Sequence, residues 1–105
     1  MKSIAEILKE INRIQSSLVS EKELADAKAY LTGSFPLRMD TYAKIAGILT
    51  SIELYGLGLD YPLRYPALIN SVTREGVMRV ARKYLHPDAM VIVVVADQEK
   101  AKLSY

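Results

Sequence analysis

The sequence predicts an α+β fold of about five helices followed by one C-terminal strand, the later part of a larger α+β domain. Two observations lead to this prediction. Apolar residues recur at spacings of three and four along most of the chain, and one uninterrupted apolar run, Met90–Ala96, is rich in β-branched residues. Such a run is typical of a strand covered on both faces, and a lone strand needs partners for its backbone groups. We therefore expect residues 1–105 to form a single partial domain.

The first two helices are predicted from periodicity and capping signals. An amphipathic pattern defines the first helix, with apolar residues at Ile4, Ile7, Leu8, Ile11, Ile14 and Leu18. Ser20, followed three residues later by Glu23, has the form of a capping box and predicts the start of a second helix. Gly33 is predicted to end that helix in the left-handed conformation. Pro36 is expected to keep residues 34–38 as a non-helical connector.

The third and fourth helical segments lie in the middle of the chain. Asp40 or Thr41 is predicted to cap the third helix, and Gly56 to end it in the left-handed conformation. A fourth segment is expected from about Tyr61 to Asn70. Pro62 suits its first turn, whereas Pro66 is expected to divide it.

The last helix is predicted to begin after Thr73, which can cap it. Its apolar positions are Val77, Val80, Ala81, Tyr84 and Leu85. The tripeptide His86-Pro87-Asp88 is expected to stop this helix, so that the predicted strand begins directly afterwards.

Composition limits the classes of function. The chain has 105 residues, of which 50% are hydrophobic and 25% charged, as in one ordinary globular domain. Its longest apolar run is far shorter than the roughly 18 residues of a membrane-spanning helix, so we expect no membrane partner. A net charge of +2 is small for a nucleic-acid-binding module, so no nucleic-acid partner is expected either. The absence of cysteine excludes disulfides and thiolate metal sites and leaves the cellular compartment open.

No catalytic constellation is visible. His86 is the only histidine, so zinc motifs that need two histidines cannot form within this chain, and no serine lies in a nucleophile-elbow context. His86 is predicted instead to cap the last carbonyls of the final helix. The chain alone is therefore not expected to be an enzyme, and no catalytic, cofactor-binding or metal-ligating residue is assigned.

The final helix carries a basic surface made of Arg74, Arg79, Arg82 and Lys83. Cations near a helix C-terminus oppose the macrodipole, and this is the interpretation that we adopt. Binding of a polyanion is the alternative, but no aromatic platform or glycine-rich phosphate loop accompanies the four cations.

The tripeptide His86-Pro87-Asp88 also matches the motif of J-domain co-chaperones, which lies between two helices. A J-domain would continue into a helix within a few residues. Here the predicted strand follows, which argues against that family.

A different resemblance covers most of the chain. In order and spacing, the sequence resembles the closing part of a domain of the pitrilysin/insulinase family of zinc metallopeptidases, which includes the mitochondrial processing peptidases. The residues that carry the resemblance are Val19-Ser20-Glu21-Lys22-Glu23-Leu24, Ala27-Lys28, Tyr30-Leu31-Thr32-Gly33-Ser34-Phe35-Pro36-Leu37, Asp40-Thr41, Ile45-Ala46, Tyr55-Gly56-Leu57, Asp60-Tyr61, Tyr65, Ile69, Val72-Thr73, Val77, Ala81-Arg82-Lys83-Tyr84-Leu85 and the run from Val91 to Asp97.

This resemblance implies more than the residues alone do. Domains of the family are longer than this chain and combine a mixed sheet with a helical layer, so the chain would supply much of that layer and the final strand. The family's zinc motif lies in the early part of a catalytic domain, so zinc would be bound elsewhere and no cofactor is expected in this chain. The Arg and Tyr that contact substrate in the partner domain are not placed; Arg38 and Tyr42 are the nearest by residue type, and neither is assigned.

The implied function is that of a non-catalytic C-terminal segment of a zinc-dependent metalloendopeptidase, or of its inactive partner subunit. It would act as scaffold and clamp wall where two domains or subunits close around an extended peptide, which zinc-bound water hydrolyses. The implied partners are the rest of the peptidase domain or a partner subunit, and a peptide substrate. The alternative is a free-standing helical interaction module that completes a partner's sheet. In isolation, we expect a homo-oligomer that pairs through Met90–Ala96.

Overall fold

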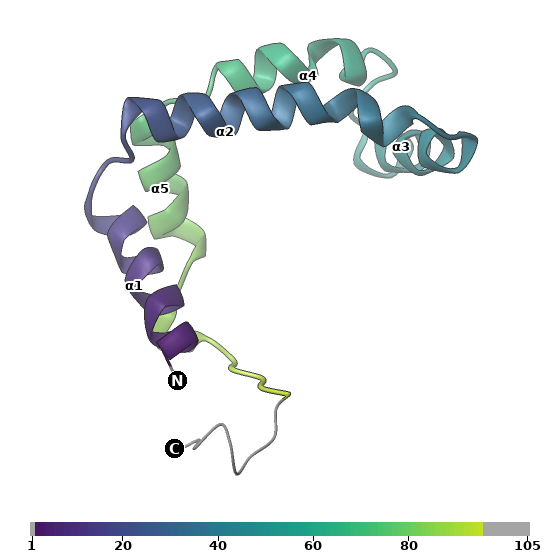
Figure 1. The fold of residues 1–105 in the computed structure, drawn as a ribbon. Coiled ribbons are helices and arrows are strands. Elements are labelled where there is room, and N and C mark those ends of the chain that lie inside the picture. The colour runs from purple at the N-terminus through teal and green to yellow at the C-terminus, as the bar shows by residue number, and fades with distance from the viewer. Residues whose placement is uncertain (1, 96–105) are drawn as a thin grey trace. The chain divides into compact units, whose positions relative to one another are not determined.

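The computed structural model describes residues 2–95, and within this range the chain forms five α-helices, two short 3-10 helices and no strand (Figure 1). The chain folds into two compact units. The first unit combines Met1–Val19 with Arg74–Tyr105, and the second unit is Ser20–Thr73. No helix in the described range is long and apolar enough to cross a membrane.

The first unit consists of α1 (Lys2–Ser16), α5 (Arg74–Tyr84) and the 3-10 helix η2 (Pro87–Ala89). The helices α1 and α5 pack side by side, and Ala81 of α5 is buried (Figure 1). The apolar stripe predicted for α1 is only half-buried at Ile11 and Ile14. A large part of the unit's apolar surface thus stays accessible.

Side chains on α1 and α5 bind the partner helix reciprocally. The Gln15 Nε2 group donates hydrogen bonds to the carbonyls of Ala81 (3.0 Å) and Leu85 (2.6 Å), and the Arg82 Nε group donates to the carbonyl of Gln15 (2.7 Å). The Ala81 carbonyl also accepts from the Leu85 amide (2.9 Å), so Gln15 adds a second donor there, whereas for the Leu85 carbonyl it supplies the donor that the end of the helix leaves missing. Arg74 Nε similarly donates to the carbonyl of Val19.

Replacing Gln15 with Ala is expected to lower the free energy of unfolding by about 1 kcal/mol, because the Leu85 carbonyl loses its donor and the Ala81 carbonyl keeps only the Leu85 amide. Urea denaturation followed by circular dichroism measures the change. Asn12→Ala, an exposed amide on the same helix, serves as the control and should have little effect. Equal midpoints for Gln15→Ala and the wild-type chain would contradict the assigned role.

The second unit consists of α2 (Glu21–Ser34), the 3-10 helix η1 (Phe35–Met39), α3 (Tyr42–Tyr55) and α4 (Tyr61–Asn70). Its buried residues among those described are Phe35, Ile52 and Tyr65. The rings of Phe35 and Tyr65 stack with centroids 4.0 Å apart, and Tyr61 meets Tyr65 edge-on at 6.0 Å. The helices α2 and α4 lie side by side, and Lys28 Nζ donates to the carbonyl of Asn70 (2.9 Å) (Figure 1).

The predicted caps of α2 and α3 are confirmed. The Ser20 hydroxyl accepts from the Glu23 amide (3.1 Å), and the Thr41 hydroxyl accepts from the Lys44 amide (3.3 Å). Gly56 follows α3 with φ of 60°, in the left-handed region where a side chain is disfavoured.

Three predicted interruptions of the helices are wrong. Gly33 does not end α2, which continues to Ser34 and runs directly into η1. Pro36 lies in the first turn of η1, where the fixed φ of proline suits a helical backbone and its missing N–H is not needed. Pro66 likewise does not divide α4, which continues through it from Tyr61 to Asn70, although Pro66 lies in the helix interior and has no N–H to donate there.

Gly33 and Gly56 therefore make a matched pair. Gly56→Ala is expected to cost about 1 kcal/mol of stability, because its backbone is left-handed. Gly33→Ala should instead be neutral or stabilising, because Gly33 is helical and an added Cβ would meet nothing within 4 Å. Denaturant midpoints measured on both variants test this, and a loss of stability at Gly33 alone would contradict it.

The predicted strand, and with it the α+β fold class, is wrong for the part of the chain that the structure describes. Residues 90–95 form no strand, and Ala96 lies outside the described residues. Met90, which precedes the β-branched residues, has the extended conformation (φ −83°, ψ 141°). A strand also needs a hydrogen-bonded neighbour, and the described residues of this chain, all helical or irregular, provide none.

Candidate functional site

The run Met90–Val95 is the most unusual surface of the first unit. No hydrogen bond joins its backbone to any described residue. Val91, Val93 and Val95 are 88%, 82% and 98% exposed, whereas Ile92 and Val94 are 54% and 43% exposed. One row of side chains is thus almost entirely bare and the alternate row is half covered, which is the pattern of an extended segment with one face toward its own protein.

This run can add to the edge of a sheet. Its backbone donors and acceptors have no partners among the described residues, its residues favour extended conformations, and it has no charge or proline to prevent pairing. Because both faces are apolar, the completed strand would suit a sheet covered on both sides. Pairing would satisfy the backbone and bury side chains that now face water.

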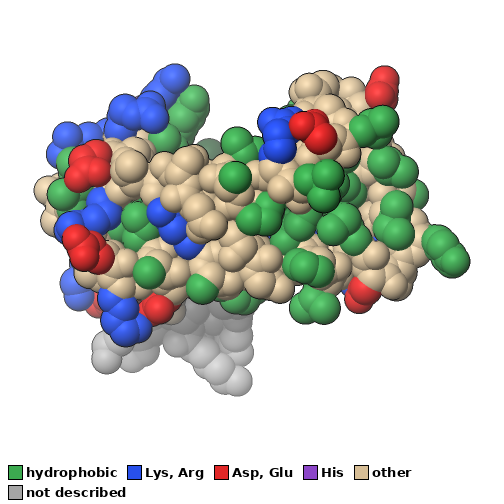
Figure 2. All heavy atoms as spheres, turned by 90° about the horizontal axis from the view of Figure 1, so that it is seen from above, with side chains coloured by type: hydrophobic (Ala, Val, Ile, Leu, Met, Phe, Trp, Pro, Cys, Tyr) green, Lys and Arg blue, Asp and Glu red, His purple; other side chains and the backbone are tan. Residues whose placement is uncertain are grey.

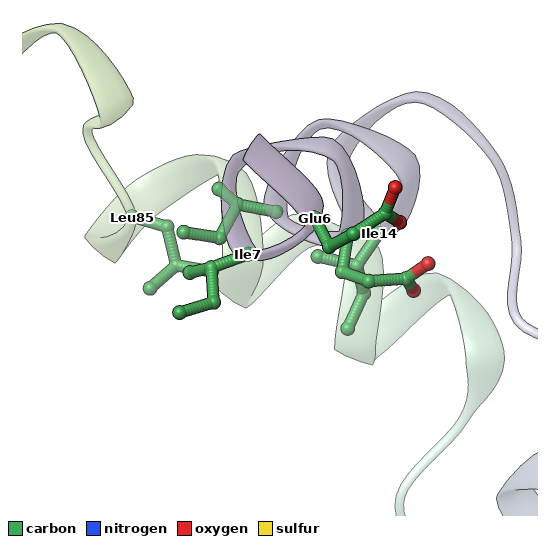
Figure 3. Close-up of a pocket in the computed structure, with 6 residues that line it drawn as sticks. Glu6, Ile7, Ile14 and Leu85 are labelled. Carbon is green, nitrogen blue, oxygen red and sulfur yellow. The ribbon is translucent and has the colours of Figure 1, made fainter. Parts of the chain in front are cut away.

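The helix α1 carries an apolar hollow of about 470 Å³ in the same unit. It is lined by Ile7, Ile11, Ile14 and Leu85, with Glu6 and Glu10 also at its wall. Figure 3 shows the side chains of Ile7 and Leu85 near each other and the Glu6 carboxylate pointing away from them. The two carboxylates are paired on their own helix, with Lys9 (3.2 Å) and Arg13 (2.8 Å), so the hollow offers apolar contact and no net charge.

His86 does not have the capping role predicted for it. Gln15, not His86, donates to the carbonyls at the end of α5, and the His86 side chain forms no hydrogen bond with another described residue. His86 is exposed and lies with Asn12, Arg82 and Asp88 around a hollow of about 540 Å³. The tripeptide that contains His86 leads into η2 and then the extended run, so the described residues do not form the paired helices of a J-domain.

The basic residues of α5 are used mainly within the unit. Arg74 and Arg82 bond carbonyls of the α1 segment, and Lys83 Nζ lies 5.0 Å from the centre of the Tyr84 ring. Arg74, Arg82 and Lys83 therefore have contacts inside the unit, and their interaction with the helix macrodipole stays a prediction.

The described residues do not fit the zinc ion of the family that the sequence resembles. Within residues 2–95, no group of three His, Cys, Asp or Glu side chains lies close enough together to hold a metal ion. The remaining candidates are also separate: Arg38 lies in η1 and borders a hollow of the second unit, whereas Tyr42, 93% exposed, does not line that hollow. No catalytic step is therefore derived for this chain.

Comparisons of the chain with family models, curated proteins and solved structures gave no match.

Proposed function

We propose that this chain is a non-catalytic segment of a zinc-dependent metallopeptidase of the pitrilysin/insulinase type, or of the inactive subunit that pairs with one. Its helices act as scaffold and clamp wall, and Met90–Val95 attaches them to the rest of the assembly by joining a sheet. The ordered sequence resemblance supports the choice of family. Zinc and the groups that activate water belong to another part of that assembly.

The bare extended run is the observation that carries this proposal. Leaving branched apolar side chains in water forfeits roughly 1.5–3 kcal/mol for each one that could be fully buried. Val91, Val93 and Val95 alone therefore represent several kcal/mol of stabilisation that becomes available only when another surface covers them. Strand addition also satisfies backbone groups that side-chain burial alone would leave unpaired.

The second candidate function is a free-standing helical module that completes the sheet of an unrelated partner. The same run favours it, because main-chain pairing depends little on the partner's sequence. The two candidates differ in whether the completed assembly contains a zinc-peptidase motif and hydrolyses peptides.

An antiserum raised against the second unit, Ser20–Thr73, can isolate the native polypeptide or assembly from its own host cells under non-denaturing conditions. We expect the isolated material to contain a His-x-x-Glu-His sequence, to hold zinc by metal analysis and to cleave a fluorogenic peptide. Cleavage should be inhibited by 1,10-phenanthroline and restored by zinc.

Isolated material without this motif, without zinc and without peptidase activity would contradict the peptidase proposal. It would leave the interaction module as the function, provided that a sheet-containing partner is present. An antiserum against an unrelated protein of similar abundance serves as the control for adventitious peptidases.

A further inference from the structure

The second unit has a hollow of about 490 Å³ that the proposed function does not use. It lies between the end of α2, η1 and the first part of α3, and its wall includes Tyr30, Leu37, Arg38, Lys44, Gly47 and Ile48. Hydrophobic side chains gather over the end of this unit that contains α3 (Figure 2), where Leu54 and Tyr55 are 72% and 70% exposed. The hollow is therefore part of a largely apolar surface.

Among the described residues around the hollow, Arg38 carries a positive charge that no acidic side chain compensates. Lys44 Nζ is paired with the Asp40 carboxylate (2.7 Å) and donates to the carbonyl of Leu37 (3.1 Å). Arg38 is exposed and forms no ion pair or hydrogen bond with any other described residue. A guanidinium with all its donors available, beside apolar side chains, is complementary to a carboxylate attached to an apolar group.

Gly47 marks a place where something from outside can approach the backbone. It lies in the interior of α3, where glycine costs roughly 1 kcal/mol relative to alanine. An added Cβ there would meet nothing within 4 Å, so packing inside the unit does not require the glycine. The missing side chain leaves space in the wall of the hollow itself.

We propose that this hollow binds an extended peptide segment in which a carboxylate lies next to an apolar side chain. The carboxylate pairs with Arg38, the apolar side chain packs on Leu37 and Ile48, and the peptide backbone passes close to Gly47. The Tyr30 hydroxyl, which has no hydrogen-bond partner among the described residues, is available to the peptide's amide groups. An acyl chain with a carboxylate head would leave that hydroxyl unused.

This inference concerns the second unit alone and does not depend on the proposed function, which rests on the extended run of the first. Its test uses two peptides with an uncharged fluorophore, Ala-Leu-Glu-Leu-Ala-amide and the same peptide with Gln in place of Glu. Fluorescence anisotropy with the whole chain is expected to show about fivefold tighter binding of the Glu peptide. Arg38→Gln should abolish that difference, and Gly47→Leu, which fills the hollow, should weaken binding of both peptides.

Arg79→Gln is the matched control, because it removes the same charge from an exposed position in the first unit. Circular dichroism verifies that each variant keeps its helices. Equal affinities for the two peptides, or a difference that persists in Arg38→Gln, would overturn the proposal. Displacement by decanoate at lower concentrations than the unlabelled Glu peptide would also overturn it, by assigning the hollow to acyl chains.

Discussion

Replacing Phe35 with Ala is expected to lower the free energy of unfolding by about 3–4 kcal/mol and to unfold the second unit. Phe35 is 5% exposed, and its ring stacks on Tyr65, which is also buried. Only one other described residue of this unit, Ile52, is buried to the same degree, so little remains to fill the cavity. Loss of helical circular dichroism and a lower urea midpoint measure the effect.

Tyr42→Ala is the control for this experiment. It removes an aromatic ring of similar size from the first residue of α3, where the side chain is 93% exposed. Its free energy of unfolding should change by less than about 0.5 kcal/mol. If both variants unfold at the same urea concentration, the stacked pair is not the centre of this unit's core.

Signals that act over a few residues were read correctly from the sequence. The hydroxyls of Ser20 and Thr41 each bond an amide three residues ahead, and the left-handed backbone at Gly56 follows directly from its place after the last turn. The break predicted at Gly33 fails because the following Pro36 fits a helical first turn, so the chain had no local reason to stop.

Features that depend on distant contacts could not be predicted. The hydrogen bond from Gln15 to Ala81 joins residues 66 positions apart, and nothing near Gln15 marks it as different from any exposed amide. Phe35 was placed in a connector, although a sole phenylalanine beside a proline could have indicated an anchor in the core. The hollow at Arg38 was missed because three separate segments form it.

The run Met90–Val95 has one property that depends on local sequence and another that depends on distant contacts. Its β-branched residues, Val91–Val95, favour an extended backbone, which is a local preference. Whether the run becomes a strand depends on an edge that the described residues do not provide, and no property of the run itself determines whether one is present. The predicted fold class is wrong because the sequence pattern indicates a backbone preference and not a hydrogen-bonded neighbour, and the described residues contain no strand.

Self-association of the purified chain is the second large effect that we expect, because Met90–Val95 can pair with its own copy when no other edge is present. Val93→Lys places a charge at the centre of the run. Since Val93 is 82% exposed, the lysine should leave each chain folded. It should weaken self-association by about 100-fold, equivalent to about 2.7 kcal/mol, because pairing would require burial of the ammonium group. Sedimentation velocity over a wide concentration range measures both proteins.

Leu63→Lys provides the matched control, since Leu63 is 85% exposed and lies on α4 in the other unit. The substitution adds the same charge to a similarly exposed apolar position, so a general gain in solubility would appear in both variants, whereas loss of β-pairing would appear only with Val93→Lys. An infrared band typical of paired strands should accompany association of the wild-type chain and of Leu63→Lys. A wild-type chain that remains monomeric at every concentration would show that the exposed run does not drive pairing, and it would remove the observation on which the proposed attachment to a larger assembly rests.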